Sequence, residues 1–382
     1  MTLTIGIAPD SFKGTLTAEQ AVDAMARGVL RWQSDATVIR MPMADGGEGT
    51  ASLLGRATGG AEAAVDCTDP LGRPITAAVW RLGAGDGDGD TWAVDTAAAS
   101  GLTLLGARER RPLRTCSRGT GELIRCAVDR GARTVVLGLG GSATVDGGKG
   151  ICQALGFRWL DSGGRELAPG GGSLTALARI DADGVGEAVR QARVRVAYDV
   201  RNPLCGPNGA AEVFGPQKGA TPEQVHRLAD GLERMADVLS GIGVGIGIDA
   251  RGLPGAGAAG GIGATLHALL GATLEPGAEL VFQSAGYAAQ LARCDLVLVG
   301  EGRLDGQTAA GKAPALVAAH ANAASIPVLA VAGCFGAGAD TLSGIADREA
   351  VSAVPPATLP SPTQAAAELA AATHRLLLRY RS

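Results

Sequence analysis

Short runs of apolar residues, many of them β-branched, recur along the chain, and most precede a glycine-containing loop and an alanine- and leucine-rich segment. Unbroken apolar runs of this length are typical of strands buried on both faces of a sheet. The predicted strands are 3–8, 37–42, 134–139, 295–300, 326–332 and 348–354, and the predicted helices include 18–31, 49–57, 313–324 and 363–378. Strands that alternate with helices predict a parallel, doubly wound α/β sheet of the flavodoxin or Rossmann type.

The middle of the chain has a different pattern. Residues 61–105 read as short strands separated by turns, with an exposed loop at 83–90, and residues 194–200 form a further strand. This pattern predicts a mixed-sheet α/β domain inserted into the first domain. The expected boundaries are 1–60, 120–155 and 290–382 for the doubly wound domain, and 61–119 and 156–289 for the inserted domain.

Composition and charge narrow the class of protein. The chain has 382 residues, enough for two domain cores. The formal net charge is −4 and no basic block occurs, which argues against nucleic acid as a partner. Seven cysteines without a C-x-x-C spacing fit reduced thiols rather than a disulfide framework or zinc site. No signal-peptide pattern and no plausible membrane span is found, so we expect a cytoplasmic protein without a membrane partner.

Lysine is rare in this chain. Only four of the 34 basic residues are lysine, and each adjoins a glycine: Lys13, Lys149, Lys218 and Lys312. Lysine should persist where a compact point charge is needed, because a guanidinium fork does not fit every such position. We therefore expect at least two of the four to contact an anionic ligand; the alternative is chance, since glycine is common here.

Polar residues cluster directly after the first two predicted strands, where open α/β sheets bind ligands. Asp10, Ser11 and Lys13 follow the first strand and indicate a site for a polar substrate or a phosphate. Asp45 and Glu48 flank two glycines after the second strand. Two interpretations of this pair stay open: a turn with acidic residues near a helix start, or convergent carboxylates that bind a metal or a hydroxyl group.

Glycine-rich loops follow further strands. Residues 138–148 contain G-x-G-x-x-A, a weak dinucleotide fingerprint, together with hydroxyls that suit phosphates equally well. Residues 255–263 contain G-x-G-x-x-G without a clear preceding strand. The stretch 306–313, G-Q-T-A-A-G-K-A, lacks the final Ser/Thr of a phosphate-binding loop. Glu301 and Asp305 just before it are candidates to supply the missing Mg²⁺ ligands.

Taken together, these motifs resemble the glycerate kinase family, of the type that includes bacterial glycerate 2-kinases. The resemblance covers nearly the whole chain and rests on eight motifs in family order: APDSFKGTLTA, PMADGGEGT, GTGELI, GLGGSATVDGG, DVRNPLCG, VFGPQKGA, GAGAAGGIGA and GEGRLDGQTAAGKAP. It implies two α/β domains with the active site in the cleft between them, and ATP, Mg²⁺ and D-glycerate as ligands, with 2-phosphoglycerate as product. The expected state is a monomer or a homodimer.

The resemblance places matching positions in the cleft, and we assign roles to them as a hypothesis. The general base is a carboxylate, Asp199 first and Asp10 second, with Lys13 as a further catalytic candidate. Substrate-binding candidates are Ser11, Asp45, Gly46, Gly47, Glu48, Asn202, Gln217, Lys218 and Arg303. Candidates for binding ATP are Gly138, Gly140, Gly141, Ser142, Asp146, Gly260, Gly261 and Lys312, and candidates for Mg²⁺ are Glu301 and Asp305.

The chain departs from the family pattern at a few positions. Val145 and Arg111 stand where Asn is usual, Cys116 and Arg118 replace Thr and Tyr, and Asp95 replaces Glu. Three rivals remain open: a glycerate 3-kinase, which differs only in regiochemistry, an NAD-dependent dehydrogenase built on the 138–143 loop, and a nucleotide-binding regulator without turnover.

Overall fold

The computed structural model describes residues 2–83, 90–241, 249–309, 312–352 and 358–380. The chain divides into two compact units, one formed by residues 1–45 and 278–382 and the other by residues 46–277. Each unit is described by itself. Within the described ranges, no helix is both long enough and apolar enough to cross a membrane.

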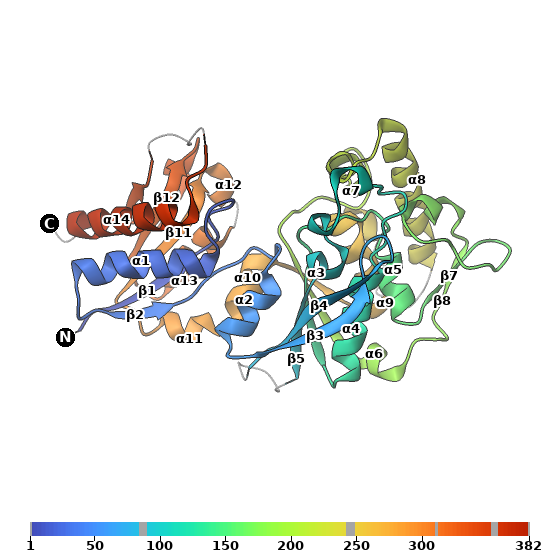
Figure 1. The fold of residues 1–382 in the computed structure, drawn as a ribbon, viewed down its shortest axis with the longest axis horizontal. Helices are drawn as coiled ribbons and strands as arrows, with labels where there is room; N and C mark the ends of the chain where they lie inside the picture. Colours follow the sequence, from blue (N-terminus) through green and yellow to red (C-terminus); the bar gives the residue numbers. More distant parts are fainter. Residues whose placement is uncertain (1, 84–89, 242–248, 310–311, 353–357, 381–382) are drawn as a thin grey trace. The chain divides into compact units, whose positions relative to one another are not determined.

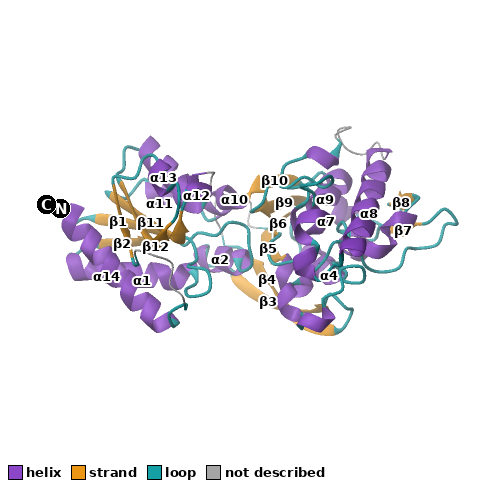
Figure 2. Ribbon diagram, turned by 90° about the horizontal axis from the view of Figure 1, so that it is seen from above, coloured by secondary structure: helices purple, strands orange, loops and turns teal. Residues whose placement is uncertain are grey.

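The first unit is built around a parallel sheet with the strand order β13-β12-β11-β1-β2 (Figures 1 and 2). Its elements are β1 (Thr4–Pro9), α1 (Ala18–Trp32), β2 (Thr37–Arg40), α10 (Gly277–Ser284), α11 (Tyr287–Leu291), β11 (Leu296–Leu304), α12 (Gly306–Ala309), α13 (Ala313–Ala323), β12 (Val328–Phe335), β13 (Asp347–Ala350) and α14 (Pro362–Tyr380). This is the flavodoxin-like order, whose switch point lies between β1 and β11.

Apolar side chains on one face of this sheet form the core of the first unit. Ile5 and Ile7 of β1 and Leu298 of β11 pack with Met25 of α1 and Leu369 of α14, all of them buried. The helices α1 and α14 lie side by side over this face (Figure 2). The helix α1 starts at the predicted residue 18, and Thr17 and Gln20 form a capping box at its N-terminus.

The second unit is built around a mixed sheet with the order β10-β9-β6-β5-β4-β3. Strands β5, β6, β9 and β10 run parallel, whereas β3 and β4 are antiparallel additions at one edge. The strands are β3 (Ala61–Thr68), β4 (Pro74–Arg81), β5 (Thr91–Asp95), β6 (Thr134–Gly138), β9 (Arg193–Tyr198) and β10 (Thr273–Pro276), with a separate pair β7 (Arg158–Leu160) and β8 (Arg179–Asp181).

Helices cover this mixed sheet. The α-helices are α2 (Thr50–Ala57), α3 (Thr96–Ser100), α4 (Arg118–Asp129), α5 (Lys149–Ala154), α6 (Glu187–Gln191), α7 (Ala210–Phe214), α8 (Pro222–Gly241) and α9 (Ile262–Leu270). Short 3-10 helices are η1 (Leu102–Leu104), η2 (Ala107–Glu109), η3 (Gly171–Ala176), η4 (Pro216–Lys218), η5 (Ala250–Gly252) and η6 (Ala258–Gly260), and the first unit adds η7 (Ala339–Thr341).

The predicted fold class is confirmed, since a parallel doubly wound sheet and a mixed sheet are both present. The domain boundaries differ from those expected. Residues 46–60 and 120–155 belong to the second unit, because β6 pairs with β5 and β9 rather than with β1 or β11. Residues 278–289 belong to the first unit. Most of the 83–90 loop lies outside the described residues.

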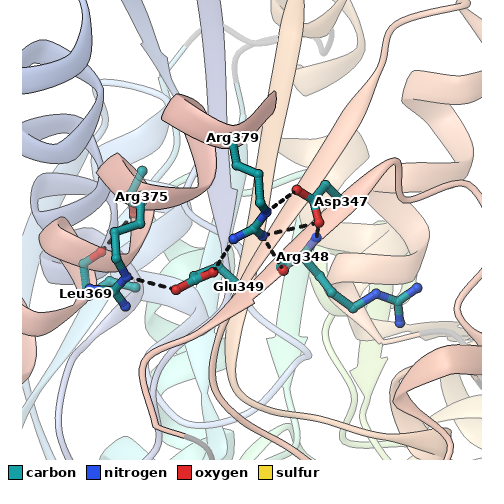
Figure 3. A network of polar contacts seen from close by, with 7 residues as sticks. Asp347, Arg348, Glu349, Leu369, Arg375 and Arg379 are labelled. Carbon is teal, nitrogen blue, oxygen red and sulfur yellow. Dashed lines mark hydrogen bonds and ion pairs between the residues drawn. The ribbon is translucent and has the colours of Figure 1, made fainter. Parts of the chain in front are cut away.

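The edge strand β13 is held to α14 by charge pairs (Figure 3). Arg379 of α14 contacts Asp347 at 2.8 Å and Glu349 at 2.8 Å and also donates to the carbonyl of Arg348. Arg375, one turn earlier, contacts Glu349 at 2.9 Å. Charged residues on an edge strand also discourage pairing with other chains.

These arginines lower the pKa of both acids. The hydrogen bond from Arg379 holds the pKa of Asp347 below its ordinary value of 3.8. Burial raises the pKa of Glu349, but hydrogen bonds from Arg379 and Arg375 outweigh burial and bring the pKa below 4.5. Because both folded-state pKa values are depressed, this network stabilises the fold above about pH 5 and loses its contribution as pH falls through those values.

We expect the substitution Arg379→Ala to lower the free energy of unfolding by about 1 kcal/mol at neutral pH and low salt. Arg375→Ala, which removes a single ion pair from the same helix, is the matched control and should cost less. Denaturant titrations at pH 7 and pH 3 measure both effects. The assignment would be contradicted if the cost of Arg379→Ala did not shrink at pH 3.

Candidate functional site

The first group of candidate residues lies at the switch point of the parallel sheet. The register of β1 and β11 pairs Pro9 with Gly300, so Asp10 and Glu301 follow at the same level on neighbouring strands. The backbone N–H of Asp10 donates to the carbonyl of Gly300 at 2.8 Å. Both carboxylates are buried, each with a residue exposure of 6%. This is where open α/β sheets bind their ligands.

Burial and neighbouring charge change the proton affinity of Asp10. Burial, together with the carboxylates of Asp45 and Glu301, raises its pKa from 3.8 to about 7, against a hydrogen bond from the Ser11 N–H and the charge of Lys13. The Lys13 ammonium lies 3.3 Å from Asp45 and its side chain is largely exposed. A buried carboxyl group that titrates near neutral pH is suited to accepting a proton from a substrate hydroxyl.

Glu301 belongs to a second set of contacts at the end of β11. Its Oε1 atom accepts a hydrogen bond from the hydroxyl of Thr308, and the same hydroxyl accepts from the N–H of Asp305 at 3.1 Å. Burial raises the pKa of Glu301, and the Asp305 carboxylate adds to the rise, whereas Thr308 and Lys312 oppose it. Arg303 lies 3.5 Å from Asp305.

The stretch 306–313, which lacks the final Ser/Thr of a phosphate-binding loop, directly follows Asp305. Lys312 is the N-cap residue of α13 and its backbone N–H donates to the carbonyl of Thr308 at 3.3 Å. Residues 310 and 311 of the predicted loop lie outside the described residues. Thr308 is the residue that the sequence analysis missed here. It lies inside the quoted motif, but its hydroxyl contacts Glu301 and Asp305, which lie before it in the chain.

The second group of candidate residues lies in the other unit, where backbone segments approach closely. The N–H of Gly140 donates to the carbonyl of Gly46 at 3.2 Å. A Cβ on Gly140 would lie 2.3 Å from the Cα of Gly47, and one on Gly141 would lie 3.2 Å from the Glu48 carboxylate. Glycine at these positions therefore lets the 46–48 turn lie against the 138–142 loop, which brings two predicted motifs together.

Asp95 positions this turn. Its carboxylate accepts hydrogen bonds from the N–H groups of Gly49 and Ala51 at 3.1 Å each, and so caps the N-terminus of α2. Burial raises the pKa of Asp95 from 3.8 to about 7, and Glu48 adds to this, against the two backbone donors. Gly138 must be glycine beside it, because a Cβ there would lie 2.6 Å from the Asp95 Oδ1 atom.

Lys218 is buried beside the 138–148 loop. Its ammonium donates to the Ser142 hydroxyl and to the Thr144 carbonyl, both at 2.8 Å. Burial lowers its pKa from 10.5 to about 7, although the Asp146 carboxylate raises it. Lys218 thus fixes the glycine loop from inside. Gln217, predicted with it as a substrate contact, is exposed.

Asp146, predicted to bind the cofactor, is fully buried and binds helix ends instead. It accepts hydrogen bonds from the N–H and hydroxyl of Ser117, the N-cap residue of α4, both at 2.9 Å. It also accepts from the N–H groups of Gly148 and Gly150 at the start of α5. These donors satisfy both carboxylate oxygens within the protein.

The remaining candidates lie near one another in the second unit. Gly260 has φ +75°, and a Cβ there would lie 2.2 Å from the Thr144 carbonyl, so the loop before α9 packs on the 138–148 loop. Gly261 is the N-cap residue of α9. Asn202 donates to the carbonyl of Asn208 at 2.9 Å, and Asp199 is exposed at the end of β9.

The structure shows the surroundings of three residues that depart from the family pattern. Val145 is fully buried in the hydrophobic core and Cys116 is buried nearby. Arg118 forms an exposed ion pair with Glu122 at 3.0 Å along α4.

Comparison with known proteins gives a consistent result. The model of the glycerate kinase family matches residues 5–380 of this chain. The glycerate 2-kinase of Escherichia coli K12 is 45% identical over 86% of this chain and 84% of its own, and the glycerate kinase of Bacillus subtilis 168 is 45% identical over 86% and 84%. A crystal structure provisionally named glycerate kinase 2, from Salmonella typhimurium LT2, superposes with a TM-score of 0.87 at 39% identity, covering 100% of this chain and 99% of that one.

Asp95 gives a stability prediction. Because its folded-state pKa is raised from 3.8 to about 7, it favours folding below pH 3.8 and this contribution is lost as pH rises through 7. We expect Asp95→Asn to become more stable relative to the wild type by roughly 1–4 kcal/mol as pH rises from 4 to 7, with no further change above that.

Denaturant unfolding of both proteins across this pH range tests the prediction. Asp66→Asn, an Asp-to-Asn change on exposed β3, serves as the control. A stability difference between Asp95→Asn and the wild type that is flat from pH 4 to pH 7 would overturn the role given to Asp95.

Proposed function

The chain belongs to the glycerate kinase family, and on that premise we propose that it transfers the γ-phosphoryl group of ATP to the 2-hydroxyl of D-glycerate, giving 2-phosphoglycerate and ADP. The observation that supports this most is the buried Asp10 at the switch point, with its pKa near 7, beside Glu301. The name of the Escherichia coli relative supports the 2-position. A cytoplasmic location and a monomeric or homodimeric state stay predictions.

Asp10 is the carboxylate that we favour as general base. The hypothesis drawn from the sequence ranks Asp199 first, but Asp199 is exposed, whereas Asp10 is buried and has a pKa of about 7. In this proposal Asp10 accepts the proton of the attacking hydroxyl while the oxygen bonds to the γ-phosphorus and ADP leaves. Phosphoryl transfer needs mainly positioning and charge neutralisation. A single well-placed general base is therefore enough for the proton transfer.

Mg²⁺ fits the carboxylates at the end of β11. Asp305 raises the pKa of buried Glu301, which is the mutual repulsion that a divalent cation would relieve. The described residues contain no cluster of three or more His, Cys, Asp or Glu that could hold a metal by themselves. Mg²⁺ needs only one or two carboxylates when phosphate oxygens and water supply its other ligands. Bound there, it would neutralise part of the phosphate charge. We propose Glu301 and Asp305 as these ligands.

The cations divide between two proposed tasks. Lys312, at the start of α13, and the glycine loops at 138–142 and 257–263 are proposed to bind the phosphates of ATP. Lys13 and Arg303, both exposed beside carboxylates, are proposed to bind the glycerate carboxylate. Lys218 is now a positioning residue in this proposal, because its ammonium is engaged by Ser142 and Thr144.

The reaction itself is tested by ³¹P NMR of the purified protein with Mg²⁺, ATP and D-glycerate. We expect a new phosphomonoester signal that grows with ADP. Coupling to one proton, a doublet, indicates the 2-phosphate, whereas a triplet would indicate the alternative 3-kinase. Folded protein that binds ATP but gives no new signal would favour a regulator without turnover.

The base is tested by comparing Asp10→Asn with Asp199→Asn. We expect Asp10→Asn to lower kcat by about 10²–10⁴ and to remove the rise in rate near pH 7, because the carboxyl group must be deprotonated to accept a proton. Asp199→Asn is the matched control and should change kcat by less than about tenfold. The reverse pattern in two folded variants would return the role to Asp199.

A further inference from the structure

A cavity of about 580 Å³ lies within the second unit, and none of its lining residues is among those proposed for phosphoryl transfer. It is enclosed by the turn between β3 and β4, the segment from η2 to α4, and the loop between β7 and η3. Its lining residues are Leu71, Glu109, Arg111, Arg114, Ala168 and Pro169. This volume is in the range of small-molecule sites and exceeds what a bare inorganic ion needs.

The cavity carries an excess of positive charge. Arg111 and Arg114 are exposed, and in the part of the chain that the structure describes neither guanidinium has a hydrogen-bond or ion-pair partner. The acid in the lining, Glu109, is already neutralised by Arg73 at 2.6 Å and accepts from the N–H of Gly106 at 2.9 Å. Two exposed guanidinium forks on one hollow, without a protein partner among the described residues, favour an anion.

The two arginines are mounted on a rigid turn. The N–H groups of Arg114 and Thr115 donate to the carbonyl of Arg111 at 2.8 and 2.9 Å, and the Thr115 hydroxyl donates to the carbonyl of Ala143 at 2.9 Å. Rigid mounting lowers the entropy lost when a ligand binds.

The opposite wall is fixed by a buried charge. The fully buried ammonium of Lys149 donates to the carbonyls of Ala168 at 2.5 Å and Gly170 at 2.8 Å and to the hydroxyl of Ser173 at 2.5 Å. Gly170, at φ +82°, packs against the arginine turn, since a Cβ there would lie 2.4 Å from the Leu113 carbonyl. Both walls are thus held in place without a ligand.

We propose that this cavity binds a small organic phosphate monoester, whose dianion lies between Arg111 and Arg114. Guanidinium groups bind phosphate oxygens in a bidentate manner, and Leu71, Ala168 and Pro169 offer an apolar wall to the organic part. The site lies beyond the proposed function. The hydrogen bond from Thr115 to the carbonyl of Ala143, which adjoins Ser142, joins the arginine turn to the 138–148 loop.

Isothermal titration calorimetry of the full chain, without ATP or D-glycerate, tests the proposal independently of kinase activity. The probes are glycerol 2-phosphate, inorganic phosphate and malonate. We expect one saturable site for glycerol 2-phosphate, with weaker binding of the two other anions. Arg111→Ala and Arg114→Ala should each weaken binding by about tenfold or more, the loss of charge-assisted hydrogen bonds. Arg108→Ala, an exposed arginine on η2 outside the lining, should change affinity by less than about twofold.

Several outcomes would overturn the proposal. They are no saturable binding of glycerol 2-phosphate at low salt, equal affinity for inorganic phosphate, equal weakening by Arg108→Ala, and displacement of the probe by D-glycerate or ATP. Thermal unfolding confirms that each variant is folded. Arg114→Lys, which keeps the charge but not the fork, should also weaken binding; unchanged affinity in it would rule out bidentate recognition.

Discussion

The parallel pairing of β1 with β11 is the constraint on which the candidate site depends. These strands come from opposite ends of the chain, and their register places Asp10 and Glu301 next to each other. A slip of one residue would turn alternate side chains to the other face and separate the two carboxylates. The apolar residues Ile5, Ile7 and Leu298 oppose such a slip, because all three are fully buried. The core of the first unit therefore sets the chemistry at its edge.

The second unit depends on buried charges that are fully hydrogen-bonded. Asp146 joins the starts of α4 and α5, and Lys149 and Lys218 hold loops by their carbonyl groups. Burying a charge is costly unless donors or acceptors replace water, and these groups have them. Removing one of these partners would leave a buried charge with fewer hydrogen bonds. Rigidity of the glycine loops is thus obtained from polar contacts rather than from apolar side chains, which glycine lacks.

Much of the fold could be predicted from the sequence, because strand and helix periodicity is local. The strands at 4–9, 134–138 and 193–198 lie within one or two residues of the predicted runs. The domain boundaries could not be predicted in this way. The apolar run of β6 is compatible with either sheet, and only its pairing with β5 and β9 assigns it. Such pairing is a long-range property that periodicity does not contain.

The sequence predicted which segments contribute to the candidate site, but not what each side chain in them contacts. In the motif G-L-G-G-S-A-T-V-D-G-G, Ser142 and Asp146 look equally suited to a ligand. The structure separates them by burial and partners: Ser142 accepts from Lys218, whereas Asp146 is enclosed by the donors of two helix ends. A sequence pattern gives residue types and spacing, but not the direction in which a carboxylate points.

The four lysines also differ in burial and partners, and this difference bears on why lysine is rare in the chain. Lys149 and Lys218 are buried and hold backbone carbonyls, a task for which a compact ammonium with several donors is suited and a planar fork is not. Lys13 follows β1 and lies close to Asp45, whereas Lys312 is the N-cap residue of α13 and its charge acts on Glu301. The first pair is used for packing, whereas contact of Lys13 and Lys312 with an anion stays a proposal. The scarcity of lysine therefore does not mark a single function.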